Sequence, residues 1–238
     1  MHLFIALLHQ LFIPLSMFLL LGFLRSEMST KDGLMDLNSV DNGLTAKGLL
    51  FVISSVSGGG KTTVIRRLMK VLGDLRLSVS HTTRQPRPGE VEGSDYYFIS
   101  RDRFKKMIQD ELFLEWAHVY GQYYGTSRAT VDSITGNGFD ALLDIDVQGA
   151  IQVKESRKDA ILIFIVPPGE EEQERRLRDR GTEGGLEVTI RLEAASQELA
   201  FIHEYHYSVL NDEIEDAVNA VSSIIKAERC RNRNNFNV

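Results

Sequence analysis

The stretch from residue 48 to residue 72 constrains the fold of this 238-residue chain more than any other part of the sequence. Residues 49–53 form a short, continuous apolar run, which is typical of a parallel strand covered on both faces. A glycine-rich turn follows, and from residue 62 to residue 72 apolar side chains return at helical spacing. A buried strand, a glycine-rich turn and an amphipathic helix in direct succession predict the opening unit of an α/β fold.

The turn has the composition of a phosphate-binding loop. It ends in Gly-Lys-Thr between an expected strand and an expected helix, which is the context in which G-x-x-x-x-G-K-[ST] carries meaning, although Ser55 stands at the first glycine position. Its backbone N–H groups can surround phosphate oxygens at a helix N-terminus. We expect Lys61 to reach the β- and γ-phosphates of a nucleoside triphosphate and the Thr62 hydroxyl to ligate magnesium. The expected loop contacts are Ser55, Val56, Ser57, Gly58, Gly59, Gly60, Lys61, Thr62 and Thr63.

Strand and helix candidates alternate along most of the remaining chain. Buried strands are expected at residues 141–143 and 161–166, and helices at 147–154, 170–180, 187–205 and 214–229. The stretch 81–131 breaks the alternation with Gly, Pro and Tyr, the β-prone run 96–99 and one helix-like segment at 101–109. The pattern predicts a three-layer α/β sandwich of the P-loop NTPase type, with a central parallel sheet and an inserted small mixed α/β subdomain.

A second group of residues suggests the acceptor of the phosphate. Arg84 and Arg87 lie three apart in a stretch stiffened by prolines, so two guanidinium groups can converge on one anion. Further motifs follow in order: Gly89-Glu90-x-x-Gly93-x-Asp95-Tyr96, Phe113-Leu114-Glu115-Trp116-Ala117, Tyr123-Tyr124-Gly125-Thr126 and Asp144-Ile145-Asp146-x-Gln148-Gly149. Together with the loop, these motifs resemble the bacterial-type guanylate kinases from about residue 48 to residue 229.

The resemblance implies a nucleoside monophosphate kinase that transfers phosphate from ATP to GMP, and by extension to dGMP, with Mg²⁺ and a helical lid. It implies that Arg84, Arg87, Tyr96 and Tyr124 bind the GMP phosphate, whereas Ser80, Glu115 and Thr126 read the guanine. An ionised carboxylate at Glu115 can accept both N1–H and N2–H₂ of guanine, which adenine cannot offer. The resemblance also places Asn211 at the adenine of ATP. Trp116 is expected in the core.

Two carboxylates end the expected strand at 141–143. Asp144 matches the position that holds magnesium, through water, and Asp146 could reach the acceptor nucleotide; the sequence does not separate the two roles. In the helix candidate 170–180, glutamates precede arginines by four residues, so ion pairs on a solvated helix explain part of the run. The resemblance adds a catalytic reading, in which Arg176, Arg180 and Arg191 close over the triphosphate and act with Lys61 and Arg84 on the transferred group.

These expectations divide the chain into three parts. Residues 1–47 are an N-terminal extension, apolar at 3–24 and polar and flexible at 25–47, and residues 230–238 are a tail. Residues 48–229 form the kinase-like domain, with its core at 48–80, 132–170 and 192–229, the GMP-binding insert at 81–131 and the lid at 171–191.

The apolar segment 3–24 leaves the cellular location open. It contains no Asp, Glu, Lys or Arg, and its length allows one membrane span. Three alternatives remain: a start of translation at Met28 or Met17, a genuine anchor, or a targeting segment, of which a secretory signal fits poorly because no basic residue precedes the run. Because the expected chemistry needs cytosolic ATP, we expect a cytoplasmic protein, associated with a membrane only if this segment is an anchor.

Charge and composition narrow the partners. A net charge of −6 gives no overall basic footprint for nucleic acid, and the single Cys230 permits no intrachain disulfide. Small-molecule substrates are therefore expected, while homo-oligomerisation, kinetics and regulation stay open. The rivals are a kinase for another monophosphate, and a guanylate-kinase-like binding module of the kind that has lost its phosphate-loop residues; Lys61, Thr62, Arg84, Arg87, Arg176 and Arg180 favour the enzyme.

Overall fold

A computed structural model describes residues 47–119, 121–179 and 185–231, with the side chains of 185–189 excepted. The apolar segment 3–24, the polar segment 25–47 except for its last residue, and most of the tail 230–238 therefore lie outside the described residues. None of the helices in the described part of the chain is long and apolar enough to span a bilayer.

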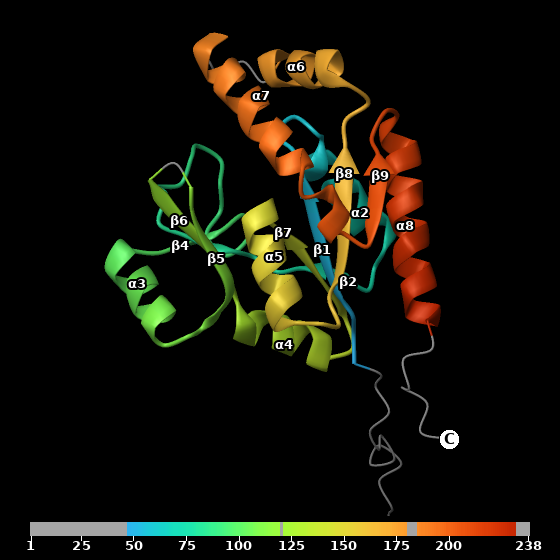
Figure 1. The fold of residues 1–238 in the computed structure, drawn as a ribbon. Helices are drawn as coiled ribbons and strands as arrows, with labels where there is room; N and C mark the ends of the chain where they lie inside the picture. The colour runs from blue at the N-terminus through green and yellow to red at the C-terminus, as the bar shows by residue number, and fades with distance from the viewer. Residues whose placement is uncertain (1–46, 120, 180–184, 232–238) are drawn as a thin grey trace, which may run out of the picture. The chain divides into compact units, whose positions relative to one another are not determined.

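The larger sheet contains five parallel strands. These are β1 (Leu50–Ser55), β2 (Leu75–Leu77), β7 (Asp140–Asp144), β8 (Ile161–Val166) and β9 (Tyr207–Leu210), in the spatial order β2-β7-β1-β8-β9 (Figure 1). The register pairs Val52 with Leu143 on one side and with Leu162 on the other. Strand order reverses at β1, and in open parallel sheets ligands bind beyond the carboxyl ends of the strands at such a reversal.

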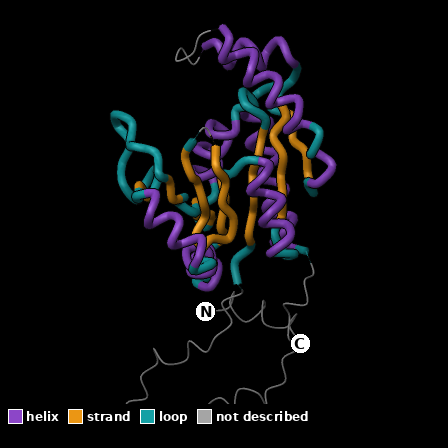
Figure 2. Tube along the Cα trace, turned by 60° about the vertical axis from the view of Figure 1, so that its left-hand side comes forward, coloured by secondary structure: helices purple, strands orange, loops and turns teal. Residues whose placement is uncertain are grey.

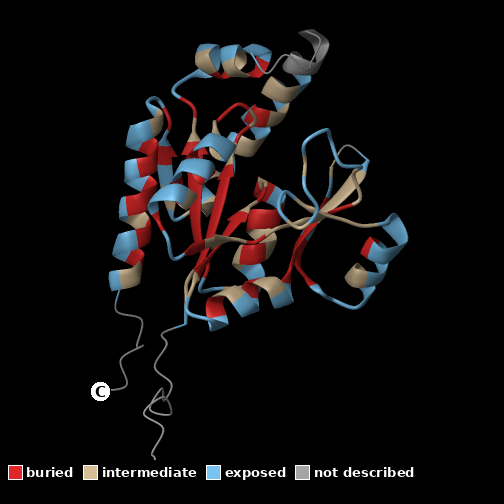
Figure 3. Ribbon diagram, turned by 180° about the vertical axis from the view of Figure 1, so that it is seen from behind, coloured by how far each residue is buried: buried red, intermediate tan, exposed pale blue. Residues whose placement is uncertain are grey.

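Helices cover both faces of this sheet (Figure 2). Phe51 and Ile53 point toward α2 (Lys61–Val71) and α8 (Ile214–Cys230), whereas Leu50 and Val52 point toward α4 (Arg128–Gly136) and α5 (Val147–Ser156). A strand that is buried on both faces carries apolar side chains at every position instead of alternating apolar and polar ones. This is why these strands could be predicted from continuous apolar runs in the sequence. Figure 3 shows the buried residues concentrated in these strands and on the inner helix faces.

A second, mixed sheet of four strands accounts for the irregular stretch 81–131. Its order is β4-β3-β6-β5, with one parallel and two antiparallel pairings. Its elements are β3 (His81–Thr82), β4 (Tyr97–Phe98), α3 (Arg101–Gln109), β5 (Phe113–Val119) and β6 (Gln122–Ser127). The predicted fold class, a parallel α/β sandwich with a mixed subdomain, is confirmed.

The last helical region differs in detail from the prediction. Helices α6 (Glu170–Asp179) and α7 (Gly185–Leu199) are followed by a separate 3₁₀ turn, η2 (Ile202–Glu204). The single helix expected at 187–205 is therefore wrong beyond Leu199, because the chain bends there before β9 and its apolar spacing continues through the bend. Arg180, the last residue of the helix expected at 170–180, lies outside the described residues.

Trp116 was expected in the core, and this was wrong. Its side chain is 38% exposed, while its neighbour Glu115 is only 4% exposed. Successive side chains of a strand point to opposite faces, and Glu115 holds the interior position in β5. The backbone of Trp116 is bridged by the side-chain amide of Gln152, which accepts from its N–H and donates to its carbonyl.

Candidate functional site

The glycine-rich loop leaves β1 at its carboxyl end and enters α2 without a side-chain cap. Gly58 and Gly60 have φ angles of 84° and 86°, a left-handed conformation that glycine adopts at little cost. Gly60 is the N-cap of α2 and offers no side-chain hydrogen bond to the first turn. The N–H groups at this helix end are therefore available to an anion, where the helix dipole favours negative charge.

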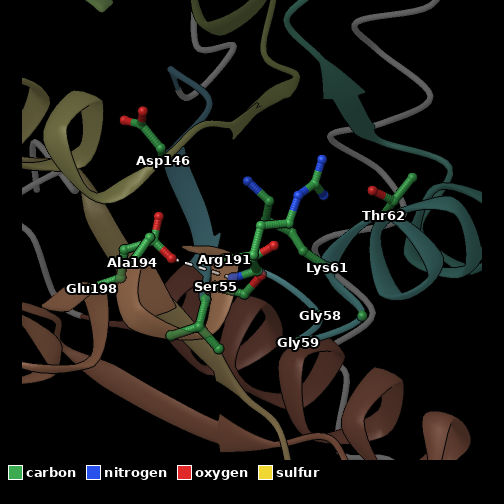
Figure 4. Close-up of a pocket in the computed structure, with 12 residues that line it drawn as sticks. Ser55, Gly58, Gly59, Lys61, Thr62, Asp146, Arg191, Ala194 and Glu198 are labelled. Carbon is green, nitrogen blue, oxygen red and sulfur yellow. Dashed lines mark hydrogen bonds between the residues drawn. The ribbon is translucent and has the colours of Figure 1, made fainter. Parts of the chain in front are cut away.

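A cavity of about 270 Å³ opens over the loop, and we call it the loop cavity (Figure 4). It is lined by the loop and the start of α2, by the N-cap residue of α5 and by residues of α7: Ser55, Val56, Ser57, Gly58, Gly59, Gly60, Lys61, Thr62, Asp146, Arg191, Ala194 and Glu198. Of the expected ATP contacts, Thr63 is exposed on α2 and Asn211 is buried behind the loop, and neither lines the cavity.

Lys61 joins the loop to the carboxyl end of β7. Its Nζ lies 2.7 Å from Asp144 Oδ1 and donates to the carbonyl of Ile145 at 2.8 Å. The positive charge thus lies between the loop and the two-carboxylate segment, a contact that the sequence analysis did not predict. Among the described residues, no cluster of three or more His, Cys, Asp or Glu side chains has the arrangement of a metal centre.

A second cavity, of about 320 Å³, adjoins the first and is called here the sheet cavity because β5 and β6 contribute to it. It is lined by Lys61, Thr62, Ser80, Tyr96, Glu115, Ala117, Val119, Tyr124, Gly125, Asp144, Ile145 and Asp146. Three residues, Lys61, Thr62 and Asp146, line both cavities. Two ligands could therefore meet at the residues that the cavities share.

Glu115 is a buried carboxyl in the sheet cavity. Burial raises its pKa to about 7, partly offset by the hydrogen bond that the Thr126 hydroxyl donates to Oε1 at 2.6 Å. A Cβ built on Gly149 would lie 2.6 Å from Glu115 Oε2, so only glycine lets the carboxylate occupy this place. Lys61 lowers this pKa from a distance, but no ion pair between Glu115 and a cation is found among the described residues. A buried carboxyl in this setting is suited to a ligand that donates hydrogen bonds.

The two predicted arginines of the 81–131 stretch differ in their surroundings. Arg84 makes a bidentate ion pair with Glu90, at 3.0 and 2.7 Å, and lies over the ring of Tyr96 at 5.3 Å. The rings of Tyr96 and Tyr124 are 6.0 Å apart and both residues line the sheet cavity. Arg87 is exposed, and neither Arg84 nor Arg87 lines that cavity.

Asp146 caps a helix and also lines both cavities. It is the N-cap of α5, where its carboxylate accepts the Gly149 N–H at 2.8 Å, and it lines both cavities. Asp144, by contrast, ends β7 and pairs with Lys61. The structure thus separates two carboxylates that the sequence could not tell apart: one is a helix cap at the junction of the cavities and the other is the partner of the loop lysine.

Of the predicted lid arginines, Arg176 and Arg191 are described and Arg180 is not. Arg176 Nε pairs with Glu172 Oε1 at 2.8 Å, and its NH1 donates to the carbonyl of Asn211 at 3.1 Å. Arg191 lines the loop cavity from α7. Both arginines therefore lie beside the loop rather than on an outer helix face, although ion pairing along the helix is present as well.

Three side chains that contact the backbone of the loop were not predicted in that role from the sequence. Gln173 Nε2 donates to the Ser57 carbonyl and Asn211 Nδ2 donates to the Gly59 carbonyl, each at 2.7 Å, while Glu198 accepts the Ser57 N–H at 3.2 Å. Asn211 was predicted only as an adenine contact. The one available signal was Gln173, a lone neutral residue within an acidic run; Glu198, one of three glutamates on α7, has no signal of its own.

Fold and site together define a class. A parallel sheet with its strand order reversed at a phosphate loop, and a second cavity meeting the loop at a lysine and a carboxylate, are the features of a P-loop kinase that acts on a small phosphorylated acceptor.

Comparison with known proteins narrows the class. The family model for guanylate kinase matches residues 47–228. Guanylate kinase from Caldanaerobacter subterraneus is 47% identical over 185 residues, covering 78% of this chain and 90% of that protein, and guanylate kinase from Salmonella typhimurium is 46% identical over 188 residues, covering 78% and 91%. A crystal structure of guanylate kinase from Anaplasma phagocytophilum aligns with a TM-score of 0.65 at 32% identity, covering 79% of this chain and 89% of that one. The chain belongs to the guanylate kinase family.

Proposed function

We propose that this protein transfers the terminal phosphate of ATP to GMP, giving ADP and GDP; dGMP would serve as a further acceptor. The observation that carries the proposal is the pair of adjoining cavities, one over the phosphate loop and one around a buried carboxyl, which share Lys61, Thr62 and Asp146. Holding two reactants in contact at the transferred group supplies much of the rate enhancement in such reactions.

The sheet cavity is the GMP site in this proposal. Glu115, once ionised, accepts N1–H and N2–H₂ of guanine, and Thr126 keeps the carboxylate oriented through its 2.6 Å hydrogen bond. Ser80 donates to an acceptor of the base. A wrong base would leave the buried carboxylate without donors, which is a strong means of discrimination.

The GMP phosphate would be bound at the opposite end of the sheet cavity. Arg84 is oriented for this by Glu90, and Tyr96 and Tyr124 offer hydroxyl donors beside it. Arg87 would add its charge by turning from solvent toward the phosphate. The acceptor phosphate is already anionic, so no general base has to remove a proton before it attacks.

The loop cavity is the ATP site in this proposal. The loop N–H groups donate hydrogen bonds to the phosphates, and Lys61 contacts the β- and γ-phosphates throughout the transfer. Arg176 and Arg191, with Arg180 from outside the described residues, neutralise charge that develops during transfer. Asn211 contributes through the Gly59 carbonyl that it holds in place, rather than through a contact within the cavity.

The residues near Lys61 fit a magnesium ion. Asp144 and Thr62 bring a carboxylate and a hydroxyl to the edge where the cavities meet, and oxygen ligands of this kind are those that Mg²⁺ prefers. Thr62 would hold the ion directly and Asp144 through water, and Mg²⁺ bound there would withdraw charge from the phosphates.

Three further proposals concern organisation. The core would be 48–80, 132–170 and 192–229, the GMP-binding part 81–131, and the lid 171–191, with helix α4 crossing the boundary at 131 because it begins at Arg128.

The cellular location follows from the proposed reaction. Because the reaction requires ATP, we place the protein in the cytoplasm. Sequencing the N-terminus of protein from its native source tests the location, since a chain that begins at Met28 lacks the apolar segment and a chain that retains it carries a candidate anchor.

The activity is tested by following phosphoryl transfer directly. Purified protein with Mg²⁺, ATP and GMP should form GDP and ADP in equal amounts, and omission of GMP should reduce ADP formation to a background of slow hydrolysis. Protein that binds GMP in calorimetry but forms no GDP would contradict the proposal and favour a binding module of the same fold.

A further inference from the structure

A carboxylate occupies part of the phosphate loop. Glu198 projects from α7 into the loop cavity, where its Oε2 accepts the Ser57 N–H at 3.2 Å (Figure 4). Ser57 is the third residue of the loop that begins at Ser55. The backbone N–H groups of such loops are the donors that receive phosphate oxygens, so Glu198 takes a position that an anionic ligand would use.

The loop does not depend on Glu198 for its shape. The Ser57 and Gly59 carbonyls are already held by the amides of Gln173 and Asn211, each at 2.7 Å. These two bonds hold the loop through its carbonyls, and a third bond within the loop runs from the Gly59 N–H to the Val56 carbonyl at 2.9 Å. Glu198 is the exception, because it binds the loop on the side that faces the ligand.

The position is also unfavourable for a carboxylate. Burial raises the pKa of Glu198 and the nearby Asp146 raises it further, while the Ser57 hydrogen bond and Lys61 act in the opposite direction. An ionised group in such surroundings costs free energy unless it is compensated. A carboxylate retained there for stability alone would be better placed in solvent, as Glu193 is on the same helix.

Other carboxylates at or near the two cavities pair with cationic side chains. Lys61 pairs with Asp144, Arg84 with Glu90 and Arg176 with Glu172, so each of these cations contacts a carboxylate of the chain itself. In those three pairs, the partner of the carboxylate is a charged side chain. Glu198 differs because its partner is a loop N–H, a group whose proposed purpose is to bind phosphate.

We propose that Glu198 is an internal stand-in for phosphate, which occupies the loop in the nucleotide-free protein and must leave when a polyphosphate binds. The proposal rests on the assignment of the loop cavity to ATP. The cost of displacing Glu198 is the same for any anion that takes its place, so an anion with few contacts, such as inorganic phosphate, binds too weakly to occupy the loop, whereas a triphosphate with many contacts still binds. The displacement lowers the affinity for every anion at the loop.

Two variants and a matched control test this role. Glu198→Gln keeps the acceptor for Ser57 N–H but removes the charge, and Glu198→Ala removes both. Glu193→Gln removes a charge from the exposed side of the same helix. Each protein is titrated by calorimetry with ATP in the absence of GMP, with inorganic tripolyphosphate, which has no base to contact other residues, and with GMP alone.

Glu198→Gln and Glu198→Ala should each bind ATP and tripolyphosphate about tenfold more tightly than wild type, as expected when a like charge is removed from an anion site. Their affinity for GMP and the affinities of Glu193→Gln should stay within twofold of wild type. Inorganic phosphate should also bind more tightly, by a similar factor, in both Glu198 variants.

Two results would overturn the inference. Unchanged ATP and tripolyphosphate affinity in both Glu198 variants would mean that Glu198 does not compete with phosphate. Weaker binding in Glu198→Ala, with wild-type binding in Glu198→Gln, would assign Glu198 to supporting the loop. These outcomes are independent of turnover: wild-type protein that binds ATP and GMP but forms no GDP contradicts the proposed function and leaves the binding comparison intact.

Discussion

Glu115 should make the stability of the ligand-free protein fall as pH rises. The residue is 4% exposed, and burial raises the pKa of its carboxyl from 4.5 to about 7. A group whose pKa is higher in the folded than in the unfolded state stabilises the protein at low pH, and this contribution is lost between the two pKa values. Each pKa unit corresponds to about 1.4 kcal/mol, so this group alone should remove about 3 kcal/mol between about pH 4.5 and pH 7.

Glu115→Gln isolates this contribution because glutamine keeps the shape of the side chain and cannot ionise. The free energy of unfolding of the variant, relative to wild type, should increase by about 3 kcal/mol over the same pH range. Urea unfolding followed by the fluorescence of Trp116, the only tryptophan, measures both proteins at each pH. Glu193→Gln, at an exposed position, is the control and should run parallel to wild type. If Glu115→Gln also runs parallel to wild type, Glu115 is not a carboxyl that burial keeps from ionising.

Three further substitutions test separate parts of the structure. Lys61→Ala should reduce the rate of phosphoryl transfer by about a hundredfold or more, since it removes a charge from the transferred group, while calorimetry should show GMP affinity within about threefold of wild type. Gly149→Ala places a methyl group 2.6 Å from Glu115 Oε2; displacement of the carboxylate should raise the KM for GMP about tenfold and leave the KM for ATP unchanged, and equal effects on both would contradict the guanine assignment. Arg229→Ala leaves the buried Asp140 without its 2.7 Å ion pair and should cost about 3 kcal/mol in urea unfolding, whereas Asp74→Asn, at the exposed partner of the same arginine, should cost less than about 1 kcal/mol.

The parts of the fold that the sequence predicted are those governed by local rules. The run at 161–166 matches β8 and the segment at 101–109 matches α3 residue for residue, because a strand buried on both faces is continuously apolar and a capped helix keeps its spacing. The bend after Leu199 was missed because η2 continues the helical spacing through a different backbone path. Local patterns do not determine where a helix yields to a turn that tertiary packing stabilises.

The sequence predicted several of the residues that line the sheet cavity. Ser80, Tyr96, Glu115, Tyr124, Asp144 and Asp146 all line the sheet cavity, as their motifs suggested. The side chains that hold the loop were not predictable, because Gln173 and Glu198 lie 116 and 141 residues from Ser57 in the sequence. Such contacts depend on how α6 and α7 pack beside the loop, and the one local signal is Gln173, the neutral residue in the acidic run at the start of α6.

Choice of the acceptor base tests the central claim most directly. Initial rates of ADP formation are compared with GMP, AMP, UMP and TMP at equal concentration, with the same enzyme, ATP and Mg²⁺, for wild type and for Glu115→Gln. The account predicts that GMP is used at least about a hundredfold faster than the other three by wild type, and that Glu115→Gln loses most of this preference while its KM for ATP is unchanged. Faster turnover with AMP than with GMP, or a preference for GMP that survives in Glu115→Gln, would contradict it.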